Sequence, residues 1–340
     1  MDPELFLKYL LFNICPSVLE RIDVETPISS ILDSKEFYCG YNIRYLFVLV
    51  YNALVERHFV GVYENPEYQW ERRQAIHLLA LGSLTLKDIR EDVLIYRKLT
   101  AIGGDLMNMK ADPAIKDVSY LSTIGNEKFR SLKPEYFSII NVFFFLYCYY
   151  DRPNKDQEFL QLYQNKQCKF EILDIPELRH HFKGINNFLF SKACSDLLVS
   201  VLVEWHQDSV PKFARVVNNL IITCMSLCLM LKVSLTHNIK PAIQKTIDLI
   251  FGVREDLGDL NIMLFLVSMK GKVNHAVLSS VVDYLMELSQ IQPDVFSGLS
   301  ENPSDMKMIT KKCQELALKN FQSNLQEHPE FDFHNNQKSI

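Results

Sequence analysis

The sequence predicts an all-α protein, built as an irregular α-solenoid of about fourteen helices. Apolar residues recur with the helical period along most of the chain, helix-start signals surround several prolines, and glycines recur at a nearly constant interval. No segment shows a clear alternation of apolar and polar residues, the pattern of a half-buried strand. We therefore expect helices throughout and no sheet of three or more strands.

Five of the 13 prolines follow a residue that favours the N-cap of a helix. An Asp, Asn or Thr side chain accepts a hydrogen bond from a backbone N–H of the first turn, and proline fits that turn because its missing N–H is not needed there. Each pair predicts a helix start: Asp2-Pro3, Thr26-Pro27, Asn65-Pro66, Asp112-Pro113 and Asn302-Pro303.

The glycines of the N-terminal half supply the predicted helix ends. Gly40, Gly61, Gly82, Gly103 and Gly125 follow one another at steps of 21, 21, 21 and 22 residues. A helix often ends at a glycine, and one helix with its loop per ~21 residues gives a helical pair per ~42, the length of HEAT and armadillo repeats. This spacing predicts a HEAT- or armadillo-like architecture, although no residue-by-residue repeat accompanies it.

Two long apolar runs raise the question of a membrane span. Residues 137–150 and 220–231 hold no charged side chain. As helices they would extend about 21 and 18 Å, short of the ~30 Å hydrocarbon core, so we expect interior helices and no membrane span. Aromatic and β-branched content gives 137–150 some strand character, but Lys133-Pro134-Glu135 before it is a helix-start pattern.

Polar and weakly periodic stretches suggest domain boundaries. We expect an N-terminal helical-repeat half at 1–150, a hinge or irregular connection at 151–186, a C-terminal helical-repeat half at 187–325 and a mobile tail at 326–340.

Composition narrows the class of partner and the compartment. The net charge of −5 gives no overall attraction to nucleic acid or anionic lipid, and the low count of 11 glycines disfavours phosphate-binding loops and tight hairpins. The eight cysteines are scattered, mostly among apolar neighbours, and the apolar N-terminal run lacks a basic flank. We expect a reduced, intracellular protein, cytoplasmic or nuclear.

Few residues qualify as ligands. Cys224 and Cys228 lie at i, i+4 and could form half of a zinc site with His206 and His237, but their apolar flanks predict core thiols, so we expect no metal and no cofactor. Candidate phosphate contacts are Arg179, His180, His181 and Lys183, together with Lys307 and Lys311 on the last predicted helix, where Lys312 and Lys319 add charge. A solvated loop is the favoured interpretation of the cluster at 179–183, and an exposed helix face explains the lysines equally well.

The tail offers a candidate partner-binding motif. Phe331 and Phe333 alternate with acidic residues in "EFDF". Exposed aromatic residues in such a segment can dock into a groove of a partner, but an end without function is the favoured interpretation.

No nucleotide-binding, hydrolase or metalloprotease motif occurs, so we expect no enzyme. We expect a non-catalytic scaffold or adaptor subunit that binds one or more proteins in a hetero-complex through helical-repeat surfaces. One alternative is a chromatin- or nucleic-acid-associated subunit, for example in genome maintenance, with local phosphate contacts. The other is an all-α enzyme whose site is assembled only in three dimensions.

Overall fold

The computed structural model describes residues 2–14, 40–56, 64–89, 112–144, 169–175, 185–207, 217–297 and 302–326. These residues are mostly helical, as predicted, with 12 helices rather than about fourteen, counting one turn at residues 86–89. The longer helices are α1 (Pro3–Ile14), α3 (Gly40–Val55), α4 (Pro66–Ala80), α6 (Asp112–Val118), α9 (Ile185–Leu189), α10 (Lys192–His206), α11 (Val217–Thr236), α12 (Lys240–Phe251), α13 (Ile262–Val273), α14 (Ala276–Leu288) and α15 (Pro303–Gln326). Three short 3-10 helices add η3 (Pro134–Tyr136), η5 (Glu255–Leu257) and η6 (Pro293–Phe296).

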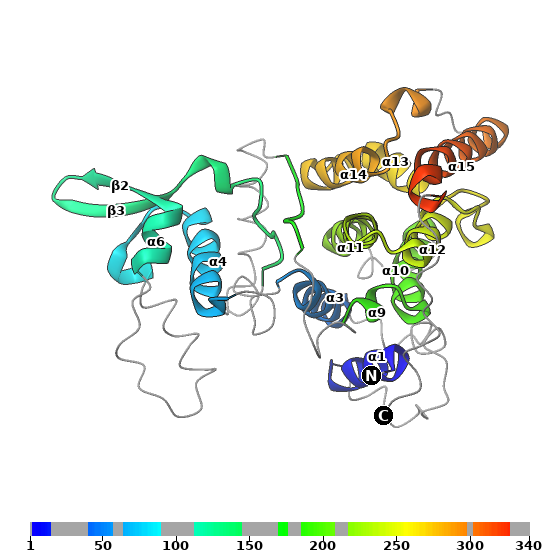
Figure 1. Cartoon of the computed structure of the whole chain (residues 1–340). Coiled ribbons are helices and arrows are strands. Elements are labelled where there is room, and N and C mark those ends of the chain that lie inside the picture. Colours follow the sequence, from blue (N-terminus) through cyan, green and yellow to red (C-terminus); the bar gives the residue numbers. More distant parts are fainter. Residues whose placement is uncertain are drawn as a thin grey trace.

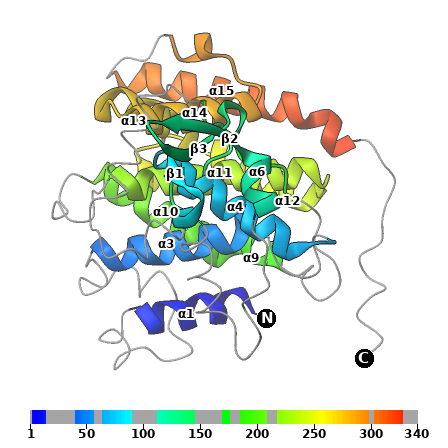
Figure 2. The same ribbon diagram turned by 90° about the vertical axis from the view of Figure 1, so that its left-hand side faces the viewer.

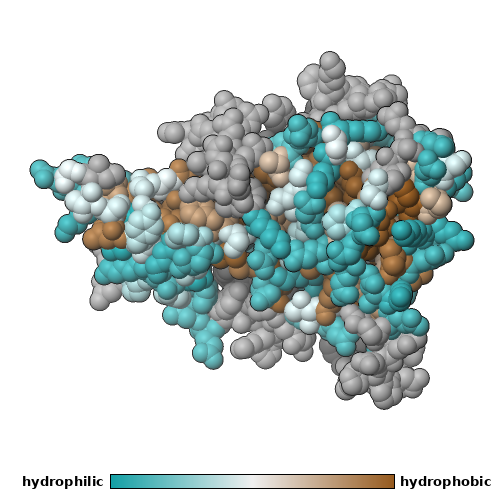
Figure 3. All heavy atoms as spheres, turned by 90° about the horizontal axis from the view of Figure 1, so that it is seen from above, coloured by the Kyte–Doolittle hydropathy of each residue, from teal (hydrophilic) through white to brown (hydrophobic). Residues whose placement is uncertain are grey.

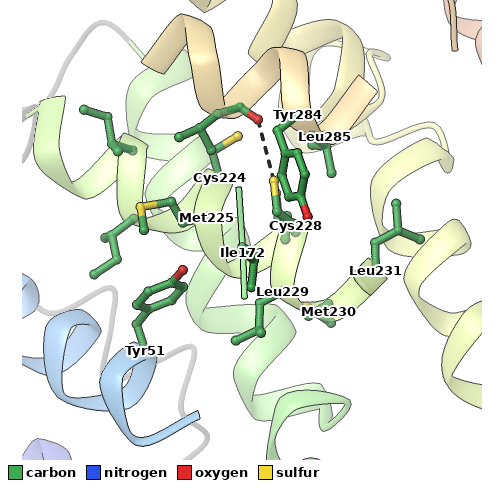
Figure 4. Packing of buried hydrophobic residues seen from close by; sticks show 14 of the residues in the cluster. Tyr51, Ile172, Cys224, Met225, Cys228, Leu229, Met230, Leu231, Tyr284 and Leu285 are labelled. Atoms are coloured by element: carbon green, nitrogen blue, oxygen red, sulfur yellow. Dashed lines mark hydrogen bonds between the residues drawn. The ribbon is translucent and has the colours of Figure 1, made fainter. Parts of the chain in front are cut away.

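α11 is the central helix of the core. It packs against α3, α10, α12 and α14, and every residue from Asn218 to Ser234 is buried. Figure 1 shows these helices around it, and Figure 4 shows side chains of α11 pointing toward several neighbours. The predicted interior helix at 220–231 is confirmed. Of the described helices, α11 alone is long and apolar enough to cross a membrane, but 83% of its most apolar window is buried inside the protein, so core packing accounts for its composition.

The repeat register predicted from the glycines is not shown. Gly40 begins α3 instead of ending a helix, and Gly125 lies in a turn between strands; Gly82 does follow α4, while Gly61 and Gly103 lie outside the described residues. In a solenoid each repeat contacts only its neighbours, whereas α11 contacts α3. A helix buried on all sides is the arrangement of a layered helical core.

The prediction that no sheet of three strands forms is wrong. β1 (Leu84–Thr85), β2 (Ser119–Ile124) and β3 (Glu127–Leu132) form an antiparallel sheet in the order β1-β3-β2. Gly125, with φ of 62°, takes the first central position of the β2–β3 turn, where a two-residue type II′ hairpin requires a positive φ. The sheet packs on α4 and α6. We call these two helices and the three strands the arm; Figure 1 shows it projecting from the helical core.

The predicted helix at 137–150 is also wrong where the structure describes it. After η3, residues 137–144 form turns and irregular backbone, although Ile140 to Phe144 are all buried. Side chains of Asn52 on α3 and of Arg73 and His77 on α4 bind backbone groups of this segment and so replace hydrogen bonds that a helix would supply. Residues 145–150 lie outside the described part of the chain.

Local helix-start signals were more reliable. α1, α4, α6 and α15 begin within one residue of a predicted start. Oδ1 of Asp2 accepts a hydrogen bond from the backbone N–H of Leu5 at 2.9 Å, and Oδ1 of Asn65 accepts one from Tyr68 at 3.1 Å. Thr26-Pro27 lies outside the described residues.

Part of the predicted connection at 151–186 crosses the core. Residues 169–175 have no helix or strand and pack against α11 and α14. The backbone N–H of Phe170 donates to Ser280 Oγ at 2.8 Å, and Nζ of Lys232 donates to the carbonyl of Ile172 and lies 3.2 Å from a carboxylate oxygen of Asp174. The domain boundaries themselves stay a prediction.

Candidate functional site

The outer edge of β2 carries backbone groups that no other described strand uses. β2 is an edge strand, and its only described partner strand is β3. Ile124 and Glu127 are the pair next to the two-residue turn. In a hairpin of this kind, the backbone N–H of each residue in that pair donates to the C=O of the other. Because bonded and non-bonded pairs alternate along an antiparallel ladder, the N–H and C=O groups of Leu121 and Thr123 point away from β3. They are placed to bind a further strand.

This edge lacks the features that usually prevent strand addition. Natural edge strands are protected by charged residues, proline or bulges. β2 reads "SYLSTI", without charge or proline, and its register with β3 is continuous over all six residues. Tyr120 and Leu121 are 50% and 52% exposed. Figure 2 shows the hairpin from the side on which the arm projects, and Figure 3 shows apolar surface beside polar surface on the arm.

The two faces of the hairpin differ in chemistry. Thr123 lies opposite Lys128 and Leu121 opposite Arg130, so both cations share one side of the sheet, which we call the cationic face. Neither cation forms an ion pair with another described residue. Tyr120 and Phe129 lie on the other side, which we call the aromatic face. A strand added to β2 would therefore meet different surroundings on its two faces.

A buried polar cluster joins the arm to the core. Arg73 on α4 binds Glu56, at the end of α3, through two hydrogen bonds of 2.9 Å, and Nη1 of Arg73 donates to the carbonyl of Ile139 at 2.6 Å. Asn141 Nδ2 donates to Glu56 Oε1 at 2.9 Å and to Asn52 Oδ1 at 3.0 Å. A buried ion pair is stable only when such further hydrogen bonds satisfy its remaining lone pairs and protons.

His77 is held in one tautomer by the same cluster. The backbone N–H of Asn141 donates to Nε2 of His77 at 3.1 Å, so Nε2 carries no proton. Nδ1 then carries it and donates to the carbonyl of Arg73 at 2.8 Å. The ring stacks on Phe144 with centroids 3.7 Å apart and an interplanar angle of 10°. A ring fixed at both nitrogens and one face, and fully buried, anchors the 139–144 segment.

These clustered groups include residue types that can perform acid–base chemistry, but their positions favour a structural role. Asn52, Glu56, Arg73, His77 and Asn141 are all buried. Their hydrogen bonds run to one another and to the backbone, and a general base must reach its substrate within about 3 Å.

The structure describes only two of the six predicted phosphate contacts, Lys307 and Lys311, both on α15. Lys307 Nζ lies 2.9 Å from Asp259 Oδ2, and Lys311 Nζ lies 4.0 Å from Glu315 Oε1, so each is next to a carboxylate. Arg179, His180, His181 and Lys183 lie outside the described residues, as do Phe331 and Phe333. No described contact brings a phosphate site together, and the nucleic-acid alternative stays a prediction.

Cys224 and Cys228 lie inside the core, where Sγ of Cys228 donates to the carbonyl of Val281 at 3.6 Å (Figure 4). Burial, together with the neighbouring Cys224, raises the pKa of the Cys228 thiol well above its ordinary value. The described residues contain no group of three or more His, Cys, Asp or Glu side chains suited to a metal ion. Both thiols therefore pack as apolar core groups.

Sequence reasoning missed the β2 edge, although a signal for it was present. Gly125-Asn126 between two six-residue runs is a two-residue hairpin pattern. The low count of 11 glycines disfavours hairpins in general, but a single two-residue turn needs only one glycine.

No protein-family model, curated protein or solved structure matches this sequence.

Proposed function

We propose that this chain is a non-catalytic, intracellular assembly subunit that binds other protein chains by adding an extended segment to the edge of β2. The observation that supports this is the uncharged edge strand on a projecting arm, with the outward N–H and C=O groups of Leu121 and Thr123 beside half-exposed apolar side chains. Main-chain hydrogen bonds supply affinity in such strand addition, and flanking side chains supply specificity.

The buried cluster supports the same proposal. By tying α4 to α3 and to residues 139–144, it fixes the base of the arm on the core. A binding strand gains affinity when its scaffold is already ordered, since less conformational entropy is lost on binding. The scaffold or adaptor role expected from the sequence is retained, with the edge of the arm in place of a helical-repeat surface.

Proximity labelling from the edge tests this proposal. A photo-crosslinking amino acid at Leu121 should capture protein chains in the native cell, while the same group at the exposed Lys245 on α12 is the control. Thr123→Pro removes an edge N–H without removing a bond to β3 and should abolish the crosslinks, whereas Thr123→Val retains the N–H and should preserve them. Crosslinks equal at both positions, or unaffected by the proline, would rule out the edge as the binding surface.

A further inference from the structure

We propose that the edge of β2 takes up residues 330–333 of a second copy of this chain as an added strand. The inference rests on the proposed function because it names the segment that occupies the same edge. It makes the contact at this surface homotypic, because the chain that the edge binds is a second copy of the same protein.

The sequence of the tail complements the two faces of the hairpin. Residues 327–340 lie outside the described part of the chain. Side chains alternate between faces along an extended backbone, which would place Phe331 and Phe333 on one face and Glu330 and Asp332 on the other. One orientation puts the two phenylalanines beside the aromatic face and the two carboxylates beside the cationic face.

On the aromatic face, Phe331 and Phe333 would lie beside Tyr120 on β2 and Phe129 on β3. Aromatic cross-strand pairs are among the more favourable ones in sheets. On the cationic face, Glu330 and Asp332 would lie toward Lys128 and Arg130. These two cations are on β3, one strand further from the added segment than β2. Two strand spacings are about 9.5 Å, a distance that a long basic side chain and a carboxylate can bridge between them.

The length of the tail favours a second copy over the same molecule. α15 ends at Gln326, four residues before Glu330, and four extended residues span at most about 14 Å. Figure 1 places α15 and the β2–β3 hairpin at opposite ends of the molecule. A tail from another molecule has no such limit. If two molecules exchange tails the assembly closes as a dimer, and if geometry prevents exchange it extends as a chain.

Sedimentation analysis of the whole chain over roughly 1–100 µM tests the contact, since a four-residue strand gives modest affinity. The whole chain should self-associate. A chain ending at Gln326 and the Thr123→Pro variant should each associate at least about tenfold more weakly, while Thr123→Val should stay within about twofold. Circular dichroism and melting temperature confirm that each variant is folded.

Mixing two defective chains tests whether the contact forms between molecules. The chain ending at Gln326 keeps its edge, and the Thr123→Pro chain keeps its tail. Each should be impaired alone, and their mixture should form a one-to-one pair. If the mixture stays monomeric while the whole chain also stays monomeric, the second-copy contact is overturned.

Charge reversal tests the orientation. The double change Lys128→Glu with Arg130→Glu should weaken association about two- to fivefold, as should the double change Glu330→Lys with Asp332→Lys, and combining all four should restore it. Lys272→Glu on α13, an exposed lysine without an ion pair to a described residue, is the control and should have no effect. Absence of restoration would overturn the proposed pairing of faces.

The two proposals fail differently. If Leu121 crosslinks depend on the edge N–H but persist in chains ending at Gln326, the tail is not the occupant and the strand-addition function stands. If neither association nor crosslinking depends on the edge N–H, both proposals fail.

Discussion

Arg73 on α4 and Glu56 at the end of α3 form a bidentate ion pair, with both hydrogen bonds at 2.9 Å and both side chains buried. The pair links the arm to the helical core. Asn141 and the carbonyl of Ile139 complete its hydrogen bonding, so the irregular 139–144 segment is part of the same junction. The position of the arm thus depends on a few long-range polar contacts.

Replacing Arg73 should be among the most destabilising single changes in the chain. Arg73→Met leaves the Glu56 carboxylate buried without its cation, which typically costs about 3–5 kcal/mol of unfolding free energy. Arg72→Met is the matched control, because Arg72 pairs with Asp117 at 2.7 Å on a partly exposed surface and should cost at most about 1 kcal/mol. Urea denaturation measures both. Equal losses would contradict the role assigned to the buried pair.

The part of the fold that sequence predicted was the part specified locally. Asp2, Asn65 and Asn302 accept hydrogen bonds within their own first turns, so the start signals could be read without knowing any neighbour. The apolar length of 220–231 likewise predicted α11 as an interior helix.

The parts that sequence did not predict depend on distant residues. The backbone at 139–144 is held by Asn52, Arg73 and His77, more than 60 positions away, and no local pattern encodes those contacts. Burial does not alternate regularly along β2 and β3. Ser119 and Leu132, at the end of the hairpin away from the turn, are buried, while Leu121 is exposed although it lies on the same face as Ser119. That β2 is an edge strand follows only from the strand order.

Lys232 should hold the extended segment 169–175 on the core. Its ammonium group, nearly buried on α11, binds the Ile172 carbonyl and Asp174. Lys232→Met keeps the apolar stem but removes these contacts, and amide exchange of residues 169–175 should accelerate by about tenfold, equivalent to one lost hydrogen bond. Lys245→Met, at an exposed position of α12, should leave exchange unchanged. Unaltered protection in Lys232→Met would show that Phe170 and its neighbours anchor the segment without the lysine.

Stability should fall as the pH rises above about 9. Burial raises the pKa of the Cys194 and Cys313 thiols to about 12, and burial also raises the pKa of the Tyr51 phenol. Above the ordinary thiol pKa the unfolded chain ionises while the folded chain stays protonated, so each thiol removes about 1.4 kcal/mol of stability per pH unit until its folded pKa is reached. Denaturation under reducing conditions at successive pH values measures the slope of unfolding free energy against pH. Cys194→Ala should make this slope less steep by the contribution of one thiol, about 1.4 kcal/mol per pH unit. A slope unchanged by that substitution would contradict the assignment to Cys194.

The β2–β3 turn should require glycine at position 125. Its φ of 62° lies where a side chain strains the backbone, even though the space around a Cβ there is open. Gly125→Ala should therefore destabilise the hairpin by about 1 kcal/mol or more, through backbone strain alone. Gly271→Ala is a matched control: that glycine lies in α13 with open space and without a positive φ, so alanine should be neutral or stabilise by up to about 1 kcal/mol. Thermal unfolding should show opposite or clearly separated shifts of the melting temperature for the two variants.

Because the turn sets the register that directs the Leu121 and Thr123 backbone groups outward, Gly125→Ala should also weaken binding at the edge. A Gly125→Ala chain that is as stable as Gly271→Ala, and binds as well as the original chain, would contradict both the turn geometry and its connection to the edge.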